Sequence, residues 1–499
     1  MPNPLGLSFG APAAERDMDF GLAKYFVESE AYKRLAARQK TILIGNRGSG
    51  KSAIFKVLAE RARNSGAIVL ELNPENYSYE MLCSVLKGER DGAWAKHGAF
   101  TSAWKYLIYV MAMKALTAAG PTIKTGAAAR IYEYLRDNHE GAQDSPISIL
   151  VSYMKRIEGL KIGSYGAAAK TRELSRLYKL EEVVALVPDL LALAARRRVV
   201  VLVDELDKGW DNSEDAQAFV SGLFQASVSL NELSDSFTVY VSLRQELYES
   251  IPALWNDAQK YRDVVETIRW DEPALLAVVA KRIRYTVPEF RSQPDDAECW
   301  NAVFAKTLEY RKAKSFNWMI DRTLYRPREI IQFCTDALEV SQDRHTAPID
   351  YSVLVVAELN YSDSREKDIA AEYRFQFPGL HSIFEVFRGR AYTMERSELE
   401  DTCLQICTGE LHTDLANGFA FQMDPERLIE VLWRIGFLRA YAVGGLKALR
   451  RSGSSYVGPH QVSSLNLQTI ARFQVHPMFR ASLGMKEARR DSDDDPDEL

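Results

Sequence analysis

The chain has 499 residues, a net charge of −5, an apolar fraction of 46% and a charged fraction of 26%. This length predicts roughly two to four domains, and the composition is that of a globular protein. The net charge excludes a protein that coats nucleic acid with its whole surface. Five cysteines in a chain of this length exclude a disulfide framework.

No segment predicts secretion or membrane insertion. The N-terminus lacks a basic region followed by an apolar core. The longest apolar segment, Ala103–Ala119, is interrupted by Lys105 and Lys114 and is short for a bilayer. We therefore expect a cytoplasmic, reduced protein without membrane contact. Cys403 and Cys407 lie four residues apart; because no second Cys or His pair lies nearby, we interpret them as buried apolar residues and not as metal ligands.

Residues 1–38 are expected to form an N-terminal segment and helix. Residues 1–15 are rich in Pro, Gly and Ala, and Asp17–Arg38 shows the spacing of an amphipathic helix. Such a helix either lies near a nucleotide base or simply packs on the next domain.

Residues 40–56 are the stretch around which the chain is organised. Thr41–Ile44 is a short apolar run typical of a buried strand. The next eight residues match G-x-x-x-x-G-K-[ST] at every specified position, and a helix-forming run begins at Ala53. The loop consists of Gly45, Asn46, Arg47, Gly48, Ser49, Gly50, Lys51 and Ser52.

A strand, a glycine-rich loop and a helix in this order predict a phosphate-binding loop. The glycines let backbone N–H groups turn towards phosphate oxygens, and the helix N-terminus adds partial positive charge. Lys51 is expected to reach the β- and γ-phosphates, and Ser52 to ligate Mg²⁺. The expected cofactors are therefore ATP and Mg²⁺.

A second strand, Ala67–Leu72, is followed by a long helical insertion over residues 74–198. The insertion contains no chemical motif, so a role in contacting another subunit, a partner or a target stays open. Val199–Val203 then predicts a strand covered on both faces. Asp204 and Glu205 follow at its carboxyl end, where ligands bind in open α/β sheets.

Asp204 is expected to hold Mg²⁺, and Glu205 to orient and polarise the attacking water. Two alternatives stay open for the acidic residues. Glu205 can instead cap a helix or pair with an arginine, and Asp207 is close enough in sequence to serve as the base.

Two further strands complete the predicted core. Phe237–Leu243 ends at Arg244, which either contacts the γ-phosphate or forms a surface ion pair, and Val264–Trp270 is the last strand candidate. The fold class is therefore an α/β P-loop NTPase core, a doubly wound parallel sheet formed by residues 39–73 and 199–270.

Residues 271–345 predict a helical lid. One of its helices begins at Pro327, flanked by Arg326 and Arg328, and proline suits a first helical turn. Both arginines are candidates for sensing the nucleotide phosphates, and so for moving the lid with nucleotide state. One of them is expected to be only an ion-pair partner at the helix start.

Residues 346–484 predict helices followed by a β hairpin, the pattern of a winged-helix-like domain. The loop Gly444–Gly458 carries Lys447, Arg450 and Arg451, which either contact DNA phosphates or are solvated. Residues 485–499, with a net charge of −4, are expected to be a disordered acidic tail.

The loop at 45–53, the run Asp204–Trp210 (Asp-Glu-Leu-Asp-Lys-Gly-Trp) and Arg326–Glu329 resemble a bacterial family of stand-alone P-loop ATPases. These are similar to the KAP, STAND and origin-recognition-type ATPases of the AAA+ group. The resemblance implies a motor with a helical lid and a winged helix, and a role in bacterial conflict systems.

The leading interpretation is an ATP-hydrolysing switch that acts with a nearby-encoded effector, a nuclease or toxin, in antiviral defence, as a homo-oligomer or with that partner. The alternative is a DNA-binding ATPase of replication or mobile-element type that uses the winged helix. A third is a structural hub in which nucleotide only stabilises the fold, and Glu205 counts against it.

Overall fold

The fold was analysed in a computed structural model. It describes residues 6–73, 93–118, 125–139, 180–207, 213–252, 254, 258–411, 420, 423–441, 455–462 and 465–487. The chain divides into two compact units. Residues 14–23 and 28–269 form the parallel-sheet unit, and residues 1–13, 24–27 and 270–499 form the helical unit.

The parallel-sheet unit is built on a five-stranded sheet with the order β2-β3-β4-β1-β5. This confirms the predicted α/β core. The strands are β1 (Ile42–Gly45), β2 (Ile68–Leu72), β3 (Val199–Val203), β4 (Phe237–Arg244) and β5 (Val265–Thr267). β1, β3 and seven of the eight residues of β4 are buried, as expected for parallel strands covered on both faces.

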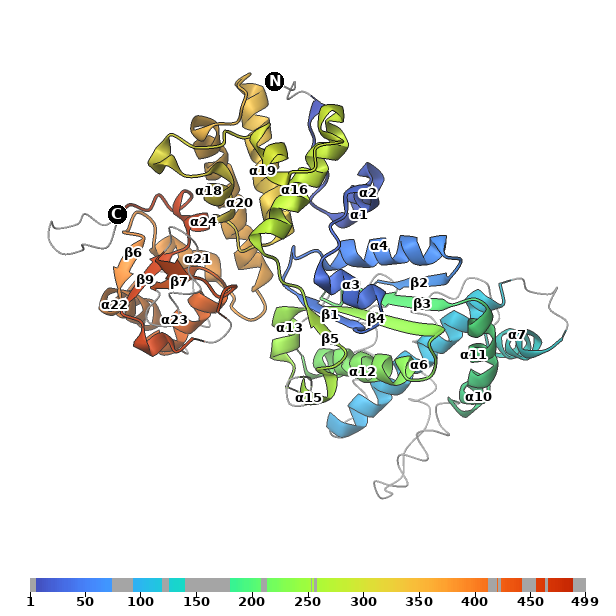
Figure 1. The fold of residues 1–499 in the computed structure, drawn as a ribbon. Helices are drawn as coiled ribbons and strands as arrows, with labels where there is room; N and C mark the ends of the chain where they lie inside the picture. The colour runs from blue at the N-terminus through green and yellow to red at the C-terminus, as the bar shows by residue number, and fades with distance from the viewer. Residues whose placement is uncertain are drawn as a thin grey trace. The chain divides into compact units, whose positions relative to one another are not determined.

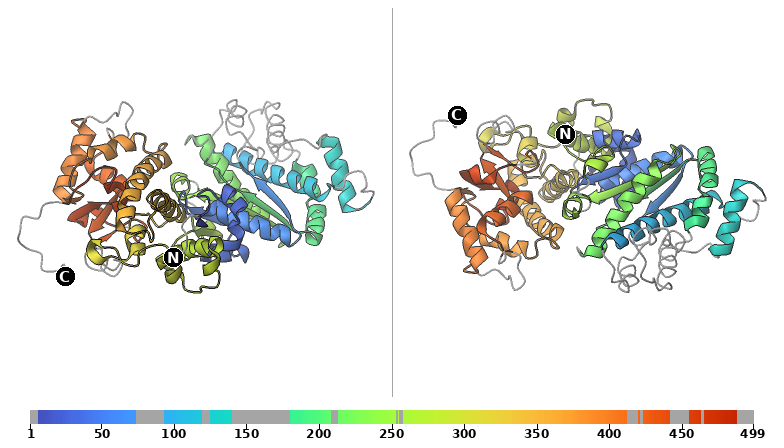
Figure 2. Two further views of the ribbon diagram at one scale, coloured as in Figure 1. Left: turned by 90° about the horizontal axis from the view of Figure 1, so that it is seen from above. Right: turned by 90° about the horizontal axis from the view of Figure 1, so that it is seen from below.

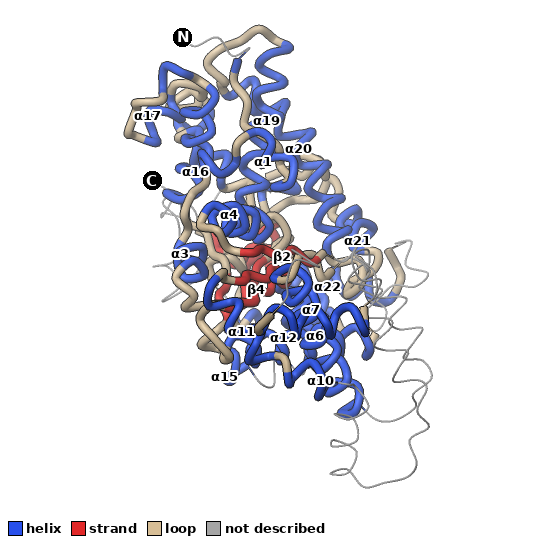
Figure 3. Tube along the Cα trace, turned by 90° about the vertical axis from the view of Figure 1, so that its right-hand side faces the viewer, coloured by secondary structure: helices blue, strands red, loops and turns tan. Residues whose placement is uncertain are grey.

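Helices cover both faces of the sheet (Figure 1, Figure 3). One face carries α1 (Ala14–Phe20), α3 (Glu30–Ala36) and α4 (Lys51–Asn64). The other carries α6 (Ala93–Leu116), α12 (Glu214–Asn231), α13 (Gln245–Ser250) and α15 (Ala258–Tyr261). The remaining helices of this unit are α7 (Ala127–Asn138), α10 (Leu180–Ala185) and α11 (Val187–Arg196).

Helix α6 comes from the predicted insertion, yet it forms part of the core beneath the sheet. It lies side by side with α12 (Figure 2). Trp104 Nε1 donates to the carbonyl oxygen of Phe219 at 3.1 Å, and both rings belong to the unit's core cluster. A Cβ on Gly222 would lie 2.7 Å from Phe100 Cβ, so the two helices approach too closely for a side chain at that position.

The prediction of one continuous helix over Asp17–Arg38 is wrong. The segment forms α1, α2 (Leu22–Tyr25) and α3 instead. Gly21 has a φ of 105°, a left-handed conformation that interrupts a helix and suits glycine. Ser29 then caps α3 by accepting a hydrogen bond from the backbone N–H of Tyr32, which starts a new helix.

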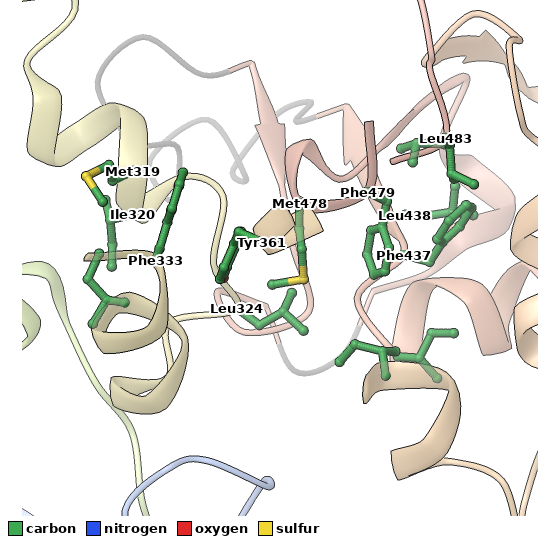
Figure 4. Close-up of a cluster of buried hydrophobic side chains, with 14 of the residues drawn as sticks. Met319, Ile320, Leu324, Phe333, Tyr361, Phe437, Leu438, Met478, Phe479 and Leu483 are labelled. Atoms are coloured by element: carbon green, nitrogen blue, oxygen red, sulfur yellow. The ribbon is translucent and has the colours of Figure 1, made fainter. Parts of the chain in front are cut away.

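The helical unit has one continuous apolar core that spans the predicted lid and the predicted C-terminal domain. Figure 4 shows residues of both regions in it. Phe333 stacks on Tyr361 with ring centroids 4.4 Å apart, and Phe437 packs on Phe479 with ring centroids 5.0 Å apart.

The helices of the helical unit that precede its β-sheet are α16 (Glu272–Thr286), η4 (Pro288–Phe290), α17 (Asp296–Asn301), η5 (Tyr310–Lys312), α18 (Ser315–Ile320), α19 (Pro327–Asp343), α20 (Tyr351–Glu372) and α21 (Leu380–Val386).

A four-stranded sheet lies in the C-terminal part, with the order β6-β9-β7-β8 and antiparallel pairing throughout. In chain order its elements are β6 (Thr393–Glu395), α22 (Arg396–Thr408), α23 (Pro425–Arg434), β7 (Leu438–Tyr441), β8 (Tyr456–Val457), η8 (Leu467–Thr469), β9 (Arg472–Val475) and α24 (Pro477–Arg480). Lys447, Arg450, Arg451 and the tail beyond 487 lie outside the described residues.

Within the described ranges, no helix is long and apolar enough to cross a membrane. Cys403 is buried in α22, and burial raises the pKa of its thiol. Cys403 therefore packs as a small apolar residue, as the sequence predicts, whereas Cys407 is only partly buried.

Candidate nucleotide site

The loop between β1 and α4 has the backbone geometry of a phosphate cradle. Gly48 and Gly50 have φ values of 80° and 98°, which only glycine adopts without strain. A Cβ on Gly45 would lie 2.6 Å from Ser49 Oγ. Gly50 is the N-cap of α4 and supplies no side-chain cap. The first backbone N–H groups of α4 therefore lack an intrahelical acceptor and suit an anion.

The side chain of Lys51 folds back onto the backbone of this loop. Its Nζ donates to the carbonyl oxygens of Gly45 at 2.7 Å and Asn46 at 3.1 Å. Burial lowers the pKa of Lys51, whereas the charges of Glu246 and Asp204 act to raise it. The ammonium is therefore held by two backbone carbonyl oxygens of the loop, in the field of these carboxylates. Ser52 follows in the first turn of α4, and Arg47 and Ala53 complete the predicted binding segment.

Asp204 and Glu205 lie where the sequence predicts, at the carboxyl end of β3. The backbone N–H of Asp204 donates to the carbonyl oxygen of Leu72 at 3.2 Å, which continues the pairing of β3 with β2. Asp204 Oδ1 accepts the N–H of Glu205 at 2.9 Å. Glu205 has a φ of 59°, a conformation that costs about 1–2 kcal/mol in a residue with a Cβ.

The strand order brings Arg244 beside the loop. β4 lies between β1 and β3, and Arg244 is in register with Gly45. Its guanidinium forms an ion pair with Asp207, and a longer one with Glu246 at 3.6 Å. Glu246 was not among the predicted site residues. It follows the strand by two positions, and only the folded position of α13 shows that it faces this site.

A small pocket opens beside the acidic pair. Lys56 and Glu71 meet there in an ion pair of 2.6 Å. The lining comes from α1, α4 and the ends of β2 and β3: Glu15, Phe55, Lys56, Glu71, Asn73, Leu202, Asp204 and Glu205. Glu15, Lys56, Glu71 and Asn73 were missed by sequence reasoning because no motif marks them.

Arg326 and Arg328 are engaged inside the helical unit. The side chain of Arg326 is buried and forms ion pairs with Glu372 at 2.8 Å and Glu329 at 3.6 Å. Burial opposes its charge, but the two carboxylates raise the pKa of Arg326 above its usual value. Arg328 Nε donates to the carbonyl oxygen of Pro12 at 3.2 Å. Arg326 thus has the ion-pair role at the helix start that we expected of one of the two; the sensing role stays a prediction.

Comparison with known families finds two matching models. Residues 8–71 match the ORC-CDC6-like family, a segment that includes β1, the phosphate-binding loop, α4 and most of β2. Residues 273–370 match the family described as FunZ-associated C-terminal helical domain, a segment that runs from α16 into α20.

Comparison with individual proteins finds a relative in Escherichia coli (strain K12), the "Putative transposon gamma-delta 80.3 kDa protein". It is 23% identical over 488 residues, which cover 96% of this chain and 67% of that protein. Two structures of the Aeropyrum pernix ORC2 protein are also similar. The ADPNP-ADP complexes are 12% identical with a TM-score of 0.27, covering 96% of each chain. The ADP form is 11% identical with a TM-score of 0.29, covering 94% of this chain and 91% of the other.

TM-scores this low do not establish a common arrangement of the whole chains. The family match is independent of them and falls on the segment that contains the loop. Together with the five-stranded parallel sheet, it indicates that this chain carries a P-loop ATPase core similar to that of the origin-recognition type.

Proposed function

We propose that this protein is an Mg²⁺-dependent ATPase of replication or mobile-element type that binds DNA through its C-terminal part. The observation that carries the proposal is the convergence of Lys51, Asp204, Glu205 and Arg244 at one end of the sheet. The ORC-CDC6-like match over residues 8–71 supports the choice of ATPase type.

In this proposal the loop N–H groups and Lys51 bind the triphosphate of ATP. Ser52 and Asp204 would hold Mg²⁺, which would supply positive charge next to the phosphates. Glu205 orients a water molecule and accepts its proton as the water oxygen attacks phosphorus, with ADP as the leaving group. Arg244 leaves Asp207 to meet the charge on the γ-phosphate.

The C-terminal module supports the DNA-binding half of the proposal. The order α21-β6-α22-α23-β7-β9, with β9 between β6 and β7, is the order of a winged helix, and we propose that it is one. In this arrangement α23 corresponds to the helix that enters the major groove.

The charges on α23 limit what that helix can contribute. Its exposed residues include Glu426, Arg427, Glu430 and Arg434, and Arg427 pairs with Glu430 at 2.6 Å. The positive and negative charges balance, so α23 gives little attraction for phosphates. We therefore assign the phosphate contacts to Lys447, Arg450 and Arg451.

The antiviral-defence interpretation has less support. It came from the resemblance to conflict-system ATPases, and neither family match favours it. The similar Escherichia coli protein is named as a transposon protein, which favours the mobile-element interpretation. Assembly into a homo-oligomer on DNA belongs to the same proposal, and an effector nuclease or toxin has no support from the comparisons.

The test combines ATP turnover with DNA binding at several salt concentrations. We expect Mg²⁺-dependent phosphate release and an affinity for duplex DNA that falls steeply with salt. Replacing Lys447, Arg450 and Arg451 together by alanine should make the dependence of log affinity on log salt concentration shallower. The expected change is the contribution of up to about three phosphate contacts. Alanine at the exposed Arg291, Lys306 and Lys312 changes the net charge equally and should leave DNA affinity almost unchanged. Turnover without any salt-dependent DNA binding would overturn the DNA half alone.

A further inference from the structure

Three metal-ligating side chains meet in the helical unit, within α20 and α21. They are Glu366, His381 and Glu385, and one ligand atom from each lies within 4.8 Å of the others. His381 and Glu385 are four residues apart on α21 and therefore share one face of the helix. The opposite face packs into the core through Ile383 and Phe384.

Glu366 is the residue that sets this cluster apart from ordinary surface acids. It is only 2% exposed. Its Oε1 atom is buried and accepts no hydrogen bond from any described residue. That oxygen faces His381 Nε2 at 3.4 Å. A buried carboxylate oxygen without a hydrogen bond costs free energy, and a cation at this point would compensate it.

The spacing suits a shared ion. Two ligands about 2.1 Å from a tetrahedral metal lie about 3.4 Å from each other, and Glu366 Oε1 and His381 Nε2 are 3.4 Å apart. The side chains of His381 and Glu385 are 45% and 37% exposed. The rim is therefore open for an ion to enter and for water to complete its coordination.

Hydrogen bonds from neighbouring groups orient Glu366 and Glu385, as hydrogen bonds to the ligands do in metal sites. Ser482 Oγ donates to Glu366 Oε2 at 2.8 Å, which leaves Oε1 for an ion. Arg388 Nε and Nη2 donate to the two oxygens of Glu385 at 2.5 and 2.6 Å, and Arg388 Nη1 donates to the carbonyl oxygen of Ser482 at 2.6 Å. Glu385 can keep one of these bonds while its second oxygen binds an ion.

We propose that Glu366, His381 and Glu385 form a binding site for a divalent transition metal, with Zn²⁺ as the best fit. An imidazole nitrogen with two carboxylates favours zinc over magnesium or calcium, which prefer oxygen ligands alone. The bound ion joins α20 to α21, and the hydrogen bond from Ser482 to Glu366 supports the ligand on α20. It is a second metal site, separate from the nucleotide site and independent of the ATPase proposal.

The test measures Zn²⁺ uptake by the full-length chain without nucleotide, in competition with a chromophoric chelator. We expect one Zn²⁺ whose affinity falls at least tenfold in H381A and in E385Q, while Mg²⁺ does not compete. H345A removes an exposed histidine outside the cluster and should bind zinc as the wild type does. Both test positions are half-exposed, so these variants should fold; E366Q is checked by circular dichroism before use.

A second measurement separates a metal site from a simple His–Glu ion pair. Zn²⁺ should raise the Tm of the wild type by several degrees and leave the Tm of H381A unchanged. The proposal is overturned if the wild type takes up no Zn²⁺, or if H381A and E385Q bind it as tightly as the wild type does.

Discussion

The guanidinium of Arg244, at the end of β4, forms an ion pair with the carboxylate of Asp207, beyond the end of β3. In the proposed mechanism this pair must open before Arg244 meets phosphate. We expect R244A to lower kcat about 10²–10³-fold, the scale of losing one transition-state donor. D207A should instead keep most of kcat and bind ATP more tightly, because Arg244 is released. Equal losses of kcat in both variants, measured by phosphate release, would assign the catalytic role to Asp207 as well.

Lys51 is predicted to be essential for nucleotide binding. K51A removes the ammonium that bridges Gly45 and Asn46, so ATP affinity should fall at least tenfold and turnover should be lost. Lys33 lies on an exposed turn of α3, paired with Glu30, and K33A is the matched control. Calorimetric titration with ATP provides the measurement; wild-type affinity in K51A would rule out the loop as the binding site.

Glu205 gives a prediction that separates stability from catalysis. Its positive φ suits glycine, so E205G should gain about 1 kcal/mol of unfolding free energy while losing hydrolysis. E205Q keeps the backbone strain and should bind ATP normally, with kcat reduced about 10²–10⁴-fold. Urea unfolding and single-turnover hydrolysis report the two effects. An E205Q variant that hydrolyses ATP at the wild-type rate would exclude Glu205 as the base.

The contact between α6 and α12 predicts opposite effects for two helical glycines. A Cβ at Gly222 on α12 would lie 2.9 Å from the backbone of Thr101, so G222A should cost about 1–3 kcal/mol of stability through overpacking. A Cβ at Gly98 on α6 meets no atom of the described residues within 4 Å. G98A should therefore stabilise the protein by about 0.5–1 kcal/mol. Thermal unfolding of both variants tests the prediction, and destabilisation of equal size in the two would contradict it.

Asp336 predicts a pH dependence for the helical unit. Burial raises the pKa of Asp336 to about 6, although the hydrogen bond from Gln332 acts to lower it. The folded state therefore binds more protons than the unfolded state between about pH 4 and pH 6, and stability falls as pH rises through this window. D336N should raise the unfolding free energy by about 1–3 kcal/mol at pH 8 and have little effect at pH 4. A gain that is the same at both pH values would show that titration of Asp336 is not its cause.

The sequence predicts the sheet strands and the phosphate-binding loop well because their signals are local. An uninterrupted apolar run such as Val199–Val203 and the eight-residue loop motif each specify their own structure. The position of Glu246 and the partner of Arg244 depend on which strands are neighbours, and no local pattern carries that order. The sequence also does not predict the cluster of Glu366, His381 and Glu385, because Glu366 and His381 lie on different helices.

Packing across long sequence separations explains the other differences. The helix at 93–116 looks like part of an insertion, but Trp104 and Phe219 place it in the core. Similarly, the lid and the C-terminal region predicted as separate share one apolar core. In both cases the sequence shows the periodicity of the helix. It does not show which part of the molecule the apolar face of that helix packs against.

The chain leaves the sheet after Leu72 and returns at Val199, on the neighbouring strand. Residues 74–198 therefore begin and end at two neighbouring strands of the sheet. Asn73, where the chain leaves β2, lines the same pocket as Asp204 and Glu205, and Asp204 directly follows β3. Because β2 and β3 are parallel, the chain leaves the sheet at the edge where Asp204 and Glu205 lie and returns at the opposite edge. Asn73 is therefore the point at which residues 74–198 connect most directly to the candidate site.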